Sequence, residues 1–260
     1  SSVIKEISRI LGRESAATVR RVAYLHCAGS KDNAADKYEY DGIRDCRIAA
    51  LLAGGHKACE YGCLGFGSCV DACSFDALHM GDDGLPVVDR EKCTACGACV
   101  RACPKDLFEL LPDDTTIYLA CSSHNRGKVV KSVCSVGCIG CGICAKVTDG
   151  DGITMKDNLP DVDHDKSPNL ILAHYKCPTN SYIDLAPKRP YMKIDAKACK
   201  GHGECRKVCP VKNCITGEDG ELHTIDPQKC IGCGLCIDAC PERAIRVIGA
   251  MGYINMDTSQ

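Results

Sequence analysis

The sequence contains few aromatic residues and no tryptophan: three phenylalanines and nine tyrosines are its whole aromatic content in 260 residues. Aromatic side chains supply much of the buried area of a large core, so a conventional large hydrophobic core is not expected. No apolar run approaches the roughly 18 residues that a membrane-spanning helix requires. Residues 1–5 also lack the apolar region of a signal peptide, which favours a reducing cytoplasmic setting.

A large net charge is absent as well, because 32 Lys and Arg residues nearly balance 34 Asp and Glu residues. There is no basic stripe of the kind that follows nucleic-acid phosphates, so nucleic acid is not expected as a partner. No Gly-x-Gly-x-x-Gly motif follows a predicted strand, which argues against a nucleotide or flavin site inside this chain. We therefore expect no autonomous catalytic site.

What the sequence has in abundance is cysteine, at 24 of 260 residues. Disulfides, zinc or iron–sulfur clusters could hold such a chain together. Disulfides are disfavoured by the reducing setting and by the poor geometry of bonds between near neighbours. The spacing of the cysteines must decide between the two kinds of metal site.

Three segments, residues 93–99, 138–144 and 230–236, share the pattern C-x2-C-x2-C with a glycine after the middle cysteine. The first and the last continue to a Cys-Pro pair, at Cys103 and Cys240. In bacterial ferredoxins this spacing places three thiolates on one cluster and the fourth on the neighbouring cluster. Zinc usually takes C-x2-C pairs two at a time with a long gap, so the triplets favour iron–sulfur clusters strongly over zinc.

Each complete ferredoxin motif follows a β-rich run that is broken by Asp-Gly. This pattern predicts strand–turn–strand hairpins over residues 77–89 and 214–226. Short helices are predicted to begin between the last two cysteines of a motif, as at residues 70–72 and 237–239.

Outside the motifs, apolar residues at helical spacing predict a packing helix over residues 3–11. Residues 19–26 and 116–121 are predicted to be strands, and each strand ends in or just before a cysteine. Residues 149–167 are acidic, contain glycine and proline and show no periodicity, so a loop or linker is expected there.

Together these features predict an α+β fold of tandem bacterial-type dicluster ferredoxin-like units, small and stabilised by clusters, with irregular connecting segments. We expect four parts. They are an N-terminal helix and strand segment with Cys27 over 1–45, a dicluster ferredoxin-like domain over 46–115, a degenerate ferredoxin-like unit with a linker over 116–190, and a C-terminal dicluster ferredoxin-like domain over 191–260.

The crossover rule of dicluster ferredoxins assigns cysteines to three complete [4Fe–4S] clusters. For the middle triplet, the next cysteine in the sequence, Cys177, is followed by proline and is taken as the remote ligand of a fourth cluster. The fourth ligand of each comes from a Cys-Pro pair or from another cysteine arm. The expected groups are Cys59, Cys63, Cys69 and Cys103; Cys93, Cys96, Cys99 and Cys73; Cys138, Cys141, Cys144 and Cys177; and Cys230, Cys233, Cys236 and Cys209.

A fifth group, Cys199, Cys205 and Cys240, needs another ligand. His202 stands where the middle cysteine of a triplet would be, and Cys214 lies shortly after Cys209. Thiolate is the commoner ligand, so Cys214 is preferred, with His202 as the alternative. A three-iron cluster at this site is a further alternative.

Four scattered cysteines remain: Cys27, Cys46, Cys121 and Cys134. They are either buried structural thiols or the ligands of one more cluster. A further cluster would account for all 24 cysteines as six groups of four, so about six [4Fe–4S] clusters are expected.

Two stretches of the chain contain long, specific motifs. One contains KYEYDGIRDC at residues 37–46, LLAGG at 51–55 and CEYGCLGFGSC at 59–69. The other is ACSSHNRGKVVKSVCSVGCIGC at residues 120–141. Both stretches resemble the B subunit of the Rnf complex. The resemblance covers roughly residues 22–144 together with the Cys-Pro-Thr at 177–179.

The resemblance implies an electron-transfer subunit that relays single electrons from reduced ferredoxin toward flavin and NAD sites of an ion-translocating ferredoxin:NAD⁺ oxidoreductase. Ferredoxin is the implied donor, and flavoprotein and membrane subunits are the implied partners. The implied location is the cytoplasmic face of the membrane. Such subunits begin with a membrane helix and a small cysteine-rich domain that this sequence lacks, so we expect either a fragment or a soluble cytoplasmic relative.

The sequence departs from that family in two further places. Thr148 and Asp149 stand where the family's third ferredoxin unit carries Cys-Pro, and a second triplet is missing, so one cluster fewer is expected there. Residues 193–247 resemble an added dicluster ferredoxin domain.

Two other functions remain open at this point. The chain could be a ferredoxin-like electron-transfer subunit of another oxidoreductase, such as a dehydrogenase, a hydrogenase or a ring reductase. It could also be a structural or regulatory metal-binding protein with no electron-transfer role.

Overall fold

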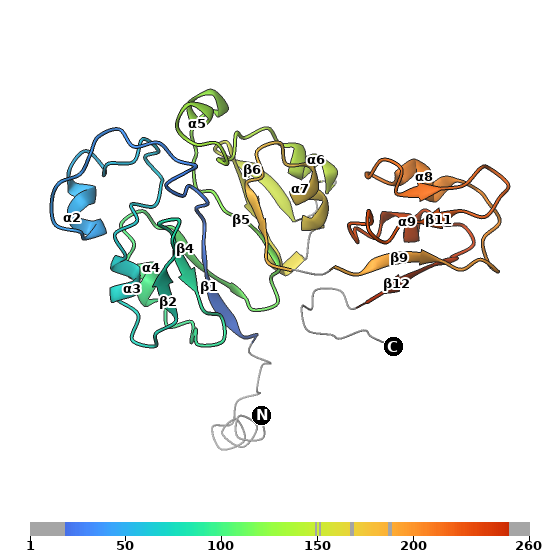
Figure 1. Cartoon of the computed structure of the whole chain (residues 1–260), viewed down its shortest axis with the longest axis horizontal. Helices are drawn as coiled ribbons and strands as arrows, with labels where there is room; N and C mark the ends of the chain where they lie inside the picture. The colour runs from blue at the N-terminus through green and yellow to red at the C-terminus, as the bar shows by residue number, and fades with distance from the viewer. Residues whose placement is uncertain (1–18, 149, 151, 167–168, 187–188, 250–260) are drawn as a thin grey trace, which may run out of the picture.

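A computed structural model describes residues 19–148, 150, 152–166, 169–186 and 189–249. The predicted helix over residues 3–11 lies outside these ranges. In the described part, the strands form six two-stranded antiparallel sheets, joined by short helices and long irregular segments. Figure 1 shows three groups of elements that follow one another along the chain. The structure confirms the expected α+β class of small ferredoxin-like units.

The first group of elements combines an N-terminal strand with the first ferredoxin motif. Strand β1 pairs with β4, with Ala23 opposite Leu110, and β2 pairs with β3 as a hairpin. The two longer strands therefore join residues that lie almost ninety positions apart. The elements are β1 (Arg21–Leu25), α2 (Cys46–Leu51), α3 (Ser68–Asp71), β2 (Leu78–Met80), β3 (Pro86–Val88), α4 (Ala98–Ala102) and β4 (Phe108–Pro112).

The second group of elements surrounds the middle cysteine triplet. Strand β5 pairs with β8, with Leu119 opposite Tyr182, and β6 pairs with β7. Helices α6 and α7 pack together beside these sheets. The elements are β5 (Ile117–Leu119), α5 (Gly127–Val133), α6 (Ile143–Val147), β6 (Ile153–Lys156), β7 (Leu159–Val162), the 3₁₀ turn η1 (His164–Lys166), α7 (Leu170–Lys176) and β8 (Tyr182–Asp184).

The third group of elements contains the last ferredoxin motif. Strand β9 pairs with β12, with Met192 opposite Val247, and β10 pairs with β11. The elements are β9 (Tyr191–Ile194), α8 (Glu204–Val208), β10 (Ile215–Thr216), β11 (Thr224–Ile225), α9 (Leu235–Asp238) and β12 (Ile245–Ile248). None of the helices in the described ranges is both long and apolar enough to span a membrane.

Most of the local predictions are confirmed. The hairpins β2–β3 and β10–β11 lie inside the predicted ranges 77–89 and 214–226, and β1 and β5 lie inside the predicted strands. The short helices α3 and α9 form where expected, but each begins two residues earlier, just before the third cysteine of its motif.

The prediction of a loop or linker over residues 149–167 is wrong for residues 153–162, because these residues form the hairpin β6–β7. Its turn is made by Asp157 and Asn158, both with positive φ, at 46° and 65°. Two consecutive residues in this conformation form the tight turn that suits a hairpin, and Asn and Asp tolerate it. Only Ile153 and Pro160 are buried in the two strands, so no alternating apolar pattern marks them in the sequence.

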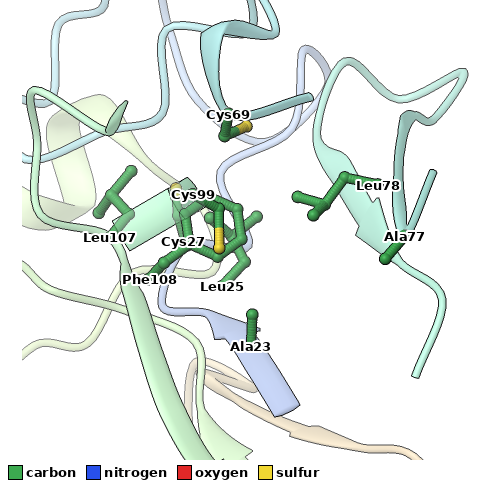
Figure 2. Close-up of a cluster of buried hydrophobic side chains, with 9 residues drawn as sticks. All are labelled: Ala23, Leu25, Cys27, Cys69, Ala77, Leu78, Cys99, Leu107 and Phe108. Atoms are coloured by element: carbon green, nitrogen blue, oxygen red, sulfur yellow. The ribbon is translucent and has the colours of Figure 1, made fainter. Parts of the chain in front are cut away.

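The apolar side chains form several small cores rather than one large one, and cysteines are part of each of the three largest. Figure 2 shows the first core, where three thiols lie among leucine and phenylalanine side chains. Its buried members are Ala23, Leu25, Cys27, Cys69, Ala77, Leu78, Cys99, Leu107 and Phe108. Groups bound by the thiols would therefore complete the packing of the cores.

The repeated glycine after the middle cysteine has a conformational role. Gly97, Gly142 and Gly234 precede α4, α6 and α9 with φ of 72°, 69° and 82°. Side chains with a Cβ disfavour this left-handed conformation, whereas glycine adopts it readily. The turn lets the chain reverse between the second and third cysteines, so that the sulfurs of a triplet stay on one side.

Substitution of Gly140 tests how closely the backbone packs at the middle triplet. A Cβ at Gly140 (φ 65°) would lie 2.7 Å from the carbonyl oxygen of Asn158, whereas a Cβ at Gly84 (φ 84°) would meet no atom within 4 Å. We expect Gly84→Ala to cost about 1–2 kcal/mol from backbone strain alone, and Gly140→Ala to cost more. Urea unfolding of the cluster-loaded protein measures both, and equal losses would contradict the close contact.

Candidate iron–sulfur centres

The structure gathers the cysteines into six groups, which we number 1 to 6. Five groups contain at least four thiols each, and one contains three. Site 1 is Cys73, Cys93, Cys96 and Cys99; site 2 is Cys46, Cys63, Cys69 and Cys103; site 3 is Cys27, Cys59, Cys121 and Cys134; site 4 is Cys138, Cys141, Cys144 and Cys177; site 5 is Cys209, Cys230, Cys233 and Cys236; site 6 is Cys199, Cys205 and Cys240.

Site 1 lies where α3 and α4 pack against each other. Burial, together with the nearby thiols of Cys93 and Cys96, raises the pKa of the Cys99 thiol to about 11. Cys73 follows α3 and packs against the same core as Cys93, and it is the crossover rule that assigns it to this group. Cys96 is exposed, so site 1 reaches the protein surface.

Site 2 takes its first thiol from the start of α2. The Asp45 carboxylate caps this helix by accepting the Arg47 backbone N–H at 2.7 Å. The Cys46 backbone N–H donates to Ser68 Oγ at 2.7 Å, which holds the beginning of α2 against α3. The four thiols of site 2 line a hollow of about 360 Å³ together with Leu107 and Phe108.

Site 3 is assembled from segments that are far apart in the sequence. Cys27 follows β1 and Cys121 follows β5, and the Ala28 N–H donates to the Ala120 carbonyl at 3.0 Å between them. Burial raises the pKa of the Cys27 thiol to about 11, and the thiols of Cys121 and Cys59 contribute to the rise. The four thiols line a hollow of about 390 Å³.

Site 4 lies between α6 and α7. Burial raises the pKa of the Cys138 thiol to about 12, and the thiols of Cys144 and Cys177 contribute to the rise. The Ser181 backbone N–H donates to Cys177 Sγ at 3.3 Å. The thiols and the side chain of Tyr182 line a hollow of about 300 Å³.

Site 5 contains a fifth cysteine. Cys214 is 2% exposed and lies beside Cys209 and Cys230 in a hollow of about 320 Å³. The sequence placed Cys214 with the three thiols of site 6 instead. The difference arises because residues 211–214 form a tight turn, with the Cys214 N–H bonded to the Val211 carbonyl, so the chain returns to the side of Cys209.

Site 6 has three thiols in the described part of the chain. Burial raises the pKa of the Cys205 thiol, and the thiols of Cys240 and Cys199 add to this. His202 lies on the connecting loop, with its side chain 45% exposed and its Nε2 atom 3.9 Å from a Glu242 carboxylate oxygen. The sequence predicted either Cys214 or His202 as the fourth ligand of site 6. Because Cys214 lies in site 5, His202 remains as the candidate.

Sites 2 and 3 differ from the predicted groups by one exchange of cysteines. The sequence assigned Cys59 to the group of Cys63 and Cys46 to the scattered set, whereas the structure brings Cys46 to site 2 and Cys59 to site 3. The thiols of Cys121 and Cys134 help to raise the pKa of the Cys59 thiol, after burial. The sequence places Cys59 only four residues before Cys63, and the intervening turn directs the two side chains to different hollows.

Backbone-to-sulfur hydrogen bonds join neighbouring sites. The Cys63 N–H of site 2 donates to Cys27 Sγ of site 3 at 3.4 Å. The Cys138 N–H of site 4 donates to Cys121 Sγ of site 3 at 3.3 Å. Sites 2, 3 and 4 are therefore connected through hydrogen bonds between their own cysteines.

The residues present fit iron–sulfur clusters. Sites 1 to 5 each supply the four thiolates that a [4Fe–4S] cluster requires. The thiols of sites 2 to 5 surround hollows instead of converging on one point, and no three His, Cys, Asp or Glu side chains in the described ranges could hold a single metal ion. In site 4, Tyr182 Oη is buried without a satisfactory hydrogen-bond partner, which costs about 1–3 kcal/mol unless the hollow contains an acceptor.

Two residues near the cysteine groups were not predicted from the sequence. Tyr182 lies in site 4, and Asn169 donates from Nδ2 to the Cys233 carbonyl of site 5 at 2.8 Å. Neither residue belongs to a cysteine motif. A tyrosine five residues after Cys177 carries no recognisable signal on its own.

Comparison with known proteins supports this chemistry. The model of the 4Fe-4S binding domain matches residues 86–109 and 223–246, which contain the triplets of sites 1 and 5 and the Cys-Pro pairs at Cys103 and Cys240. These two segments of the chain are therefore similar to 4Fe-4S binding domains.

The predicted resemblance to B subunits of Rnf complexes is also confirmed. The chain is 40% identical over 180 residues to the B subunit of the Na⁺-translocating ferredoxin:NAD⁺ oxidoreductase complex of Acetobacterium woodii, covering 69% of this chain and 54% of that protein. It is 43% identical over 183 residues to the B subunit of the proton-translocating ferredoxin:NAD⁺ oxidoreductase complex of Clostridium ljungdahlii, covering 70% and 64%.

An archaeal relative is similar to the same degree. The B subunit of the ion-translocating oxidoreductase complex of Methanosarcina acetivorans is 40% identical over 164 residues, which cover 63% of this chain and 62% of that protein. The chain thus spans between 54% and 64% of the length of the three curated relatives.

Cys214 offers a test of the ligand sets. We expect Cys214→Ala to retain all the iron of the unchanged protein and to lose stability on the order of 1 kcal/mol, because only one buried sulfur is removed. Cys233→Ala, within the same site, is expected to lose about four iron atoms. Iron analysis of anaerobically purified variants measures both, and a loss of about four iron atoms in Cys214→Ala would return this thiol to the ligand set.

Proposed function

We propose that this protein is an electron-transfer subunit that relays single electrons along six cluster sites, within an Rnf-type ion-translocating ferredoxin:NAD⁺ oxidoreductase. A bound cluster accepts and releases one electron at a time. The thiolates of this chain hold the clusters, while backbone N–H donors and burial adjust each reduction potential. The observation that carries the proposal is the direct hydrogen bonding between ligand residues of consecutive sites.

The order of the sites follows from the elements that they share. Cys69 and Cys73, at the two ends of the same helical turn, belong to sites 2 and 1. Sites 2, 3 and 4 are linked by the two backbone-to-sulfur hydrogen bonds. The order that we propose is therefore 1, 2, 3, 4 for the first two groups of elements.

Helix α7 connects site 4 to the C-terminal pair of sites. Its N-cap residue, Asn169, donates to the Cys233 carbonyl of site 5 at 2.8 Å, and its C-cap residue is Cys177 of site 4. Seven helical residues span about 10 Å, so the distance between the two sites is short. Sites 5 and 6 then share α8 and α9, which pack together.

The ends of this series are suited to exchange electrons with partners. Cys96 of site 1 is exposed, and site 6 carries the half-exposed His202. We propose reduced ferredoxin as the donor and a flavoprotein and membrane subunits as partners, at the cytoplasmic face of a membrane. The relatives support this, since each is named as part of an oxidoreductase complex that translocates ions.

The type of cluster at site 6 depends on whether His202 binds iron. His202 occupies the position that the middle cysteine has in the triplets, so we propose it as the fourth ligand of a [4Fe–4S] cluster. If His202 does not bind iron, the three thiolates of site 6 hold a [3Fe–4S] cluster. An electron paramagnetic resonance signal in the oxidised protein distinguishes the three-iron form.

Iron and acid-labile sulfide analysis tests the number of sites. For six [4Fe–4S] clusters we expect about 24 iron and about 24 sulfide per chain, and a visible absorption that bleaches on reduction by ferredoxin. About 20 of each would indicate five clusters. Zinc with little iron, or a loaded protein that ferredoxin does not reduce, would contradict the electron-transfer function.

Asn169 tests the connection between sites 4 and 5. Asn169→Asp keeps an oxygen that can cap α7 but replaces the amide donor with a carboxylate, which repels the Cys233 carbonyl. We expect unchanged iron content and several-fold slower spread of electrons to sites 5 and 6, measured by rapid freeze-quench spectroscopy after substoichiometric reduction. Asn213→Asp, at an exposed residue of the third group of elements, is the control and should leave the rate unchanged. Equal rates in both variants would contradict this route.

A further inference from the structure

Tyr182 brings a buried polar group into site 4 that is not a thiol. It begins β8, where it pairs with Leu119 of β5, and it is 3% exposed. The His174 ring nitrogen Nδ1 lies 3.1 Å from its backbone carbonyl oxygen, which fixes this end of the strand against α7. The side chain lines the same hollow as Cys138, Cys144 and the other thiols of site 4.

The hydroxyl of Tyr182 has no satisfactory partner within the described protein atoms. Its Oη atom is fully buried, and the thiol of Cys144 lies close enough to interact with it. Thr179, which also lines this hollow, differs because its Oγ1 already has partners: it lies 2.8 Å from Ser181 Oγ and 3.8 Å from Cys177 Sγ. A buried hydroxyl that faces sulfur atoms and lacks an oxygen or nitrogen partner is arranged to donate to sulfur.

We propose that Tyr182 is a positioning residue that donates its hydroxyl hydrogen bond to a sulfur at site 4, and that it thereby raises the reduction potential of this site relative to its neighbours. The inference rests on the proposed function, because it requires a redox-active cluster at site 4. A donor to sulfur stabilises the more negative, reduced state, so its presence makes reduction easier. The hydroxyl proton stays on Tyr182 throughout, and only one electron arrives or leaves.

Site 4 lies in the middle of the proposed series, so a change in its reduction potential affects electron transfer in both directions. Site 4 is hydrogen-bonded to site 3 through Cys138 and Cys121, and it is connected to site 5 through α7. A higher potential at this central position would hold an electron between the first three sites and the C-terminal pair. Tyr182 would thus set how readily electrons cross between the two parts of the chain.

The test is a redox titration of the cluster-loaded Tyr182→Phe variant, followed by electron paramagnetic resonance. We expect the full iron content of the unchanged protein, with one of six reducible components shifted to a more negative potential and the other five unmoved. Tyr24→Phe is the matched control, because it removes an equally buried hydroxyl that donates to the Thr115 carbonyl at 2.7 Å. It should lower stability without shifting any potential.

A second variant covers the case in which Tyr182→Phe loses its cluster. Placing 3-fluorotyrosine at position 182 keeps the shape and makes the hydroxyl a stronger donor, so the same component should shift to a more positive potential. Unmoved potentials in a fully loaded variant would overturn the role of Tyr182 and leave the relay function intact. A protein that binds no clusters at all would instead overturn the proposed function.

Discussion

The structure depends on bringing thiols from distant parts of the chain to a few common points. Site 3 shows this most clearly, because its thiols extend from Cys27 to Cys134 and follow a strand, a loop, another strand and a helix. The apolar cores are small and contain cysteines themselves, so they offer little stability without the groups that the thiols bind. In such proteins the free energy of metal binding is a large part of the free energy of folding.

The secondary structure serves this convergence. The pairings β1–β4 and β5–β8 place Cys27 and Cys121 side by side at the ends of their strands. The glycines before the short helices reverse the chain inside each triplet, and the helices connect a ligand of one site to a ligand of the next. Cysteines of different sites consequently touch one another, which is the arrangement that the proposed electron relay needs.

Local sequence patterns predicted the repeated parts of the molecule. The triplets, the Cys-Pro pairs and the Asp-Gly hairpins are short-range features, and the structure forms β2–β3 and β10–β11 where they indicate. The spacing could not decide which hollow receives Cys46 and which receives Cys59, because the intervening turn directs their side chains. Cys214 was misplaced for the same reason, since a tight turn returns it to Cys209. Tyr182 and Asn169 make contacts between distant segments, and no single-sequence pattern marks such contacts.

The central claim is that six cluster sites form one continuous series from site 1 to site 6. Anomalous diffraction at the iron absorption edge, from anaerobically grown crystals of the loaded protein, tests it most directly. We expect six iron centres in the order proposed, with Cys46 on the same cluster as Cys63, and Cys59 on the same cluster as Cys27. A missing centre between sites 2 and 4, or Cys46 and Cys27 on the same cluster, would contradict it.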